Sequence, residues 1–237
     1  CETELPVDDL LVGTSDGGFI FGQVKKRLTL SAREDSDLAS ALSQFVRQFL
    51  ACRTGRDSSS PWNQPIDPIR SRLLLVTGSR APAVIREDIP ATLTRLRSLV
   101  TGQSIEHAAV NQSEKRCLKT LLDHIRRIWQ LVSGSLPTDE DVKELLSLVR
   151  IESISVEVGG TEEGTAKSLL RQAVVQNPIW ADAAWEILIE ACAGFAQSRS
   201  GADRNSLQKL LLNANLPLRV PRNYRASIER LKNYSRG

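Results

Sequence analysis

Two short strand-like segments joined by a turn predict a β-hairpin near the start of the chain. Residues 5–12 (LPVDDLLV) and 19–25 (FIFGQVK) have the composition of strands, and the Gly, Asp and Ser residues of 13–18 favour a turn between them. Apolar residues at helical spacing then predict an amphipathic helix over 37–52. The continuous apolar run 71–77 predicts a strand covered on both faces, as in a parallel sheet.

The rest of the chain reads mainly as helix, with one more strand. Thr138 followed by acidic residues is typical of a helix start, and residues 150–158 predict a strand that returns to the sheet of the hairpin. The predicted helices are 82–100, 112–133, 138–149, 161–176, 178–198, 203–214 and 221–234, and we expect Trp180 and Trp185 to be core anchors. We therefore expect an α/β core over residues 1–158 and an α-helical extension over residues 159–237.

Composition excludes collagen-like, disordered and disulfide-scaffold proteins. The 237 residues are 41% hydrophobic and 25% charged, which is ordinary for a globular chain. No apolar run reaches the ~18 residues needed to span a bilayer, and the four cysteines are too widely spaced for a zinc site. We expect a cytoplasmic protein with reduced thiols and no membrane partner. Because the sequence contains no methionine, even at position 1, we read it as a piece of a longer protein.

The net charge of +3 is unevenly distributed. Residues 199–237 contain nine basic side chains and two acidic ones, and Arg222 and Arg225 lie in the last predicted helix. A basic end on a near-neutral body is typical of a phosphate-binding surface, although a solvated helix face has the same composition. Residues 77–80 (TGSR) follow a predicted strand but lack the pattern of a nucleotide-binding loop.

Residues of the hairpin carry the candidate chemistry. Gln23 and Lys25 lie two apart in the second strand and therefore face the same side, and Asp8 or Asp9 can lie opposite them on the first strand. A carboxylate and an amide oxygen are suitable ligands for Mg²⁺ or Mn²⁺, and a lysine can position a water or balance phosphate charge. An edge hairpin whose polar residues simply face solvent is the alternative.

The stretch from Asp8 to Arg27, with the helix after it, resembles the PD-(D/E)xK superfamily of restriction-endonuclease-like proteins, in the variant with Gln in place of the acid. It is similar to Mrr-type enzymes and to the N-terminal double-strand DNA nuclease domains of bacterial anti-phage effectors that carry a STAND module. The resemblance implies a mixed sheet flanked by helices. It also implies a catalytic set of Asp9, Gln23 and Lys25, with Asp8 as an alternative metal ligand.

The resemblance further implies a metal-dependent endonuclease acting on double-stranded DNA. From their charge, we expect Lys26, Arg27, Arg222 and Arg225 to contact the DNA backbone. A homo-oligomer and a fused NTPase or sensor module beyond Gly237 are the implied partners. The family usually has an acidic residue on a helix before the first strand, which is missing here, so the fragment could be inactive. The sequence leaves open RNA as substrate, and a degenerate nuclease-like module that only binds protein or nucleic acid.

Overall fold

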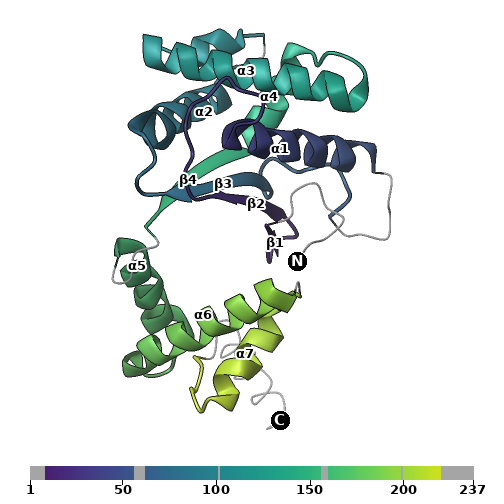
Figure 1. Cartoon of the computed structure of the whole chain (residues 1–237). Helices are drawn as coiled ribbons and strands as arrows, with labels where there is room; N and C mark the ends of the chain where they lie inside the picture. The colour runs from purple at the N-terminus through teal and green to yellow at the C-terminus, as the bar shows by residue number, and fades with distance from the viewer. Residues whose placement is uncertain (1–8, 56–61, 101, 156–159, 199, 220–237) are drawn as a thin grey trace, which may run out of the picture. The chain divides into compact units, whose positions relative to one another are not determined.

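A computed structural model describes residues 9–55, 62–100, 102–155, 160–198 and 200–219 of the chain. The chain folds as two units, Cys1–Ser155 and Val156–Gly237. The first unit is α/β, and the described part of the second is mainly α-helical (Figure 1).

The first unit is built on a four-stranded mixed sheet with the order β1-β2-β3-β4. The hairpin is antiparallel, and β2, β3 and β4 are mutually parallel. The strands are β1 (Leu10–Gly13), β2 (Phe19–Lys25), β3 (Arg72–Gly78) and β4 (Val149–Ile154). The later strand therefore joins the sheet of the hairpin, as the sequence predicts. It is shorter than the predicted 150–158, of which residues 156–159 lie outside the described part.

Four α-helices of this unit lie on one side of the sheet (Figure 1). They are α1 (Asp37–Thr54), α2 (Ile89–Arg97), α3 (Gln112–Ser133) and α4 (Asp139–Leu148), and η2 (Ile105–Ala108) is a short 3₁₀ turn.

The predicted helix 82–100 is shorter in the structure and begins as a π turn, η1 (Val84–Asp88). Pro90 has no N–H to donate to the carbonyl of Arg86, and its ring crowds that carbonyl. The N–H of Ile89 bonds instead to Val84, five residues back.

The core of the first unit lies between these helices and one face of the sheet. Phe21, Leu73 and Leu75 are buried on that face, because neighbouring strands in register present their side chains to the same side. The alternate residues are less covered: Val24 is 52% exposed, and Leu74 is half-buried. The prediction that residues 71–77 form a parallel strand is thus confirmed, but within this unit only one face of β3 is fully buried.

The second unit has a small core of its own, which includes Leu170, Val175 and Leu211. Trp180 and Trp185 are half-buried against it, in agreement with their expected role as core anchors. Its elements are α5 (Thr161–Leu169), the π turn η3 (Leu170–Val174), the 3₁₀ turn η4 (Pro178–Trp180), α6 (Ala181–Ser198) and α7 (Arg204–Asn213). The predicted helix 221–234 lies outside the described residues. None of the helices in the described part combines the length and apolar character needed to cross a bilayer.

A capping box begins α4. Thr138 Oγ1 accepts a hydrogen bond from the N–H of Asp141 at 3.1 Å, and Asp141 Oδ2 accepts one from the N–H of Thr138 at 2.9 Å. The box satisfies two N–H groups that would otherwise lack partners. We expect Thr138→Ala to lower the free energy of unfolding in urea by about 1 kcal/mol.

Thr120→Ala is the matched control, because Thr120 lies inside α3 and bonds only to a carbonyl of its own helix. Equal losses of unfolding free energy in the two variants would show that the cap does not stabilise the first unit.

Candidate active site

The antiparallel register of the hairpin brings the predicted site residues to one edge of the sheet. Leu10 is the partner of Gly22, so the next position outward places Asp9 opposite Gln23. Lys25 ends β2 at the same edge, where β3 and β4 also end. Ligands of open α/β sheets bind preferentially outside the carboxyl ends of such parallel strands.

Asp9 and Gln23 are in direct contact. Asp9 Oδ2 accepts a hydrogen bond from Gln23 Nε2 and a second one, at 2.7 Å, from the backbone N–H of Val24. Because β1 begins only at Leu10, the carboxylate acts as acceptor where the strand ladder has not yet begun. Asp9 therefore also holds the end of β2 in place.

Gln23 is buried with half of its amide unused. Its side chain is 2% exposed, and its Oε1 has no hydrogen-bond partner among the described residues. A buried polar atom without a partner costs about 1–3 kcal/mol. Rotating the amide by half a turn would bring Oε1 against the Asp9 carboxylate, and two oxygens so placed need a cation or a proton between them.

The donor set fits a hard divalent cation. Mg²⁺ takes oxygen ligands and is commonly held by one or two side chains while it keeps several waters. Asp9 and Gln23 are the oxygen donors that meet here, whereas Asp8 lies outside the described residues. Within the described ranges, no three His, Cys, Asp or Glu side chains gather as a metal cluster.

Lys25 lies on the same face of β2 as Gln23, but no hydrogen bond or ion pair joins it to Asp9 or Gln23. It is half-buried, and its ammonium has no hydrogen-bond or ion-pair partner in the described part of the chain. The structure thus joins Asp9 to Gln23 and leaves Lys25 two positions along. Lys26 and Arg27 follow the end of β2 and are exposed, and Arg222 and Arg225 are outside the described residues.

Thr77 is a polar residue at this edge that the sequence alone does not assign to the site. It is the register partner of Lys25 on β3, it is 2% exposed, and its Oγ1 has no partner among the described residues. The signal available in the sequence is the hydroxyl that ends the apolar run LLLVT. Only the parallel pairing of β2 with β3 places that hydroxyl beside Lys25.

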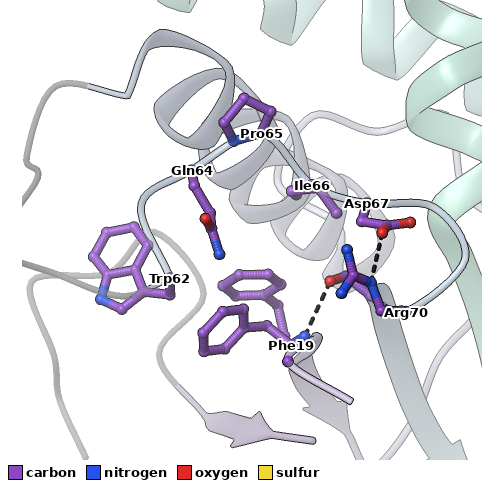
Figure 2. A pocket seen from close by; sticks show the side chains of 10 residues that line it. Phe19, Trp62, Gln64, Pro65, Ile66, Asp67 and Arg70 are labelled. Carbon is purple, nitrogen blue, oxygen red and sulfur yellow. Dashed lines mark hydrogen bonds and ion pairs between the residues drawn. The ribbon is translucent and has the colours of Figure 1, made fainter.

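A cavity of about 90 Å³ lies at the other end of β2 (Figure 2). Phe19, Trp62 and Gln64 surround it, and the Phe19 N–H donates to Ser71 Oγ at 3.0 Å. Arg70 is held there by Asp67, at 2.6 Å. The cavity has room for roughly three waters. It is about 20 Å of strand away from Lys25, so it is separate from the Asp9–Gln23 pair.

Gly78, the last residue of β3, lies close to the backbone of Lys26, which follows β2. A Cβ at Gly78 would lie 2.9 Å from the carbonyl oxygen of Lys26, which is backbone and cannot rotate away. We expect Gly78→Ala to lower the free energy of unfolding by about 1–3 kcal/mol, as overpacking does. The measurement is urea unfolding of the first unit. Gly13→Ala is the control, since its Cβ would meet only the Phe19 ring, at 3.9 Å; an equally large loss there would contradict the assignment.

Comparison with known proteins adds no relative to this geometry: no family model, curated protein or solved structure matches the chain.

Proposed function

We propose that the chain is a metal-dependent endonuclease domain that hydrolyses phosphodiester bonds in double-stranded DNA. The contact between Asp9 and Gln23, which leaves a buried amide oxygen without a partner among the described residues, is the observation that carries the proposal. The order of groups is that of the PD-(D/E)xK motif in its Gln variant, with an acid on one strand and Gln-x-Lys on the next. A restriction-endonuclease-like fold and a role in prokaryotic defence against phage belong to the same proposal.

In this proposal the residues of the site divide the work. Asp9 supplies negative charge and Gln23 a neutral oxygen to hold Mg²⁺ or Mn²⁺. The bound ion supplies Lewis acidity, which lowers the pKa of a water and stabilises charge on the phosphate. Lys25, about 7 Å along the strand from Gln23, balances the phosphate charge or orients the attacking water. The exposed Lys26 and Arg27 contact the DNA backbone without reading sequence.

A second candidate function is a non-catalytic binding module, and one observation favours it. The Asp9 carboxylate already accepts two hydrogen bonds within the hairpin, which is a sufficient structural reason for its presence. In that case Gln23 in place of an acid marks a degenerate site, and the hairpin serves only to support a binding surface.

Plasmid cleavage separates the two functions. We expect the protein to nick supercoiled DNA with Mg²⁺ or Mn²⁺ and to stop when a chelator is added. Asp9→Asn keeps an acceptor for the Val24 N–H while removing the charge, and Gln23→Leu replaces the amide with an apolar group of similar length. Each of these variants, and Lys25→Ala, should lower the nicking rate at least about 100-fold.

Lys119→Ala is the control for these variants, because it removes an exposed cation on α3, outside the site. Circular dichroism checks that every variant stays folded. Absence of metal-dependent nicking, or nicking that persists in Lys25→Ala, would contradict the nuclease proposal. A parallel assay with structured RNA decides which backbone is the substrate.

A further inference from the structure

Three arginines lie together near the amino ends of β3 and β4, and the two on the strands lie on the face of the sheet opposite to Gln23. Arg72 begins β3, Arg150 is the second residue of β4, and Arg97 ends α2. Arg150 is the register partner of Leu74, two residues after Arg72, so the strands present Arg72 and Arg150 on the same face. We call Arg72, Arg97 and Arg150 the arginine cluster.

Hydrogen bonds hold two of these guanidinium groups close together. Arg150 Nη1 donates to the carbonyl of Ser147 at 2.7 Å and to that of Val149 at 2.9 Å. Arg97 Nη1 donates to the same Val149 carbonyl at 3.2 Å. The two cations therefore share one acceptor oxygen.

No carboxylate within the described ranges forms an ion pair with the cluster. Burial lowers the pKa of Arg97, and the neighbouring charge of Arg150 lowers it further. Burial also lowers the pKa of Arg150, with a contribution from Arg72. Partly desolvated like charges repel one another, so the arrangement is unfavourable until an anion joins it.

Capping of α4 explains only part of the cluster. Arg97 and Arg150 donate to carbonyls at the end of that helix, which is a common role for basic side chains. Arg72 is exposed and has no hydrogen-bond or ion-pair partner in the described part of the chain. Its position beside Arg150 adds repulsion without any compensating contact.

We propose that the arginine cluster binds a phosphate group, presented by a nucleic-acid backbone or as free phosphate. The planar guanidinium offers paired N–H donors that match two phosphate oxygens, and most of the donors in the cluster are not used by the described part of the protein. Arg72 is about 16 Å along β3 from Thr77 and on the other face of the sheet, so this binding does not depend on the proposed nuclease site.

The test is binding by the whole 237-residue chain in the presence of a chelator, which prevents any metal-dependent cleavage. Fluorescence anisotropy measures the affinity for a labelled 20-base-pair duplex over a range of salt concentrations. ³¹P NMR titration measures the affinity for inorganic phosphate. We expect Arg72→Glu to weaken binding of both probes at least about tenfold and to reduce the salt dependence of duplex binding.

Arg116→Glu is the matched control, since it makes the same charge change at an exposed residue of α3. Arg72→Ala removes the guanidinium without adding a negative charge or breaking a capping hydrogen bond. It therefore shows whether lost binding in Arg72→Glu comes from the missing guanidinium or from misfolding. Loss of both duplex and phosphate binding identifies a backbone phosphate as the ligand, whereas loss of phosphate binding alone identifies a free phosphate. Equal behaviour of the Arg72 and Arg116 variants with both probes would overturn the proposal.

Discussion

The contact between Asp9 and Gln23 is the interaction on which the hairpin and the proposed site both depend. It joins the start of β1 to the end of β2, and it brings a carboxylate against a buried amide whose oxygen has no described partner. Structurally, the carboxylate accepts a hydrogen bond from the N–H of Val24, near the end of β2. Chemically, rotating the Gln23 amide by half a turn would set two oxygens against each other, and these need a cation or a proton between them. The same contact thus supports both the fold and the proposed metal site.

The one-sided covering of the sheet decides where such a site can form. Within the first unit, helices bury the middle of the face that carries Phe21, Leu73 and Leu75. Polar residues on that face collect at the carboxyl end, where Gln23 and Thr77 are enclosed and Lys25 is half-buried. Burial strengthens electrostatic interactions there, because little water competes for the polar groups. An exposed hairpin with the same residues would lack this environment.

Both ends of the parallel strands carry polar groups that the described part of the protein does not satisfy. At one end the unused atoms are oxygens, which attract a cation; at the other end they are guanidinium donors, which attract an anion. Arg72 and Arg150 lie on the less covered face of the sheet, whereas Gln23 and Thr77 lie on the buried face, so the two sites share no side chain.

Local patterns in the sequence were enough to predict the hairpin, its Gln-x-Lys motif and the start of α4. Two strand-like segments around a turn indicated the hairpin, and Thr138 with the acids after it indicated the helix start, because these signals act between residues close in the chain. The π turn before Pro90 was not predicted, although proline disfavours a regular helix, because the apolar residues around it keep helical spacing.

The neighbours of each strand, in contrast, follow only from the folded structure. Thr77 lies beside Lys25, and Arg150 joins Arg72 and Arg97, because β3 pairs in parallel with β2 and β4 in one particular register. That register depends on how the helices pack over the sheet, which is a sum of contacts between residues far apart in the chain.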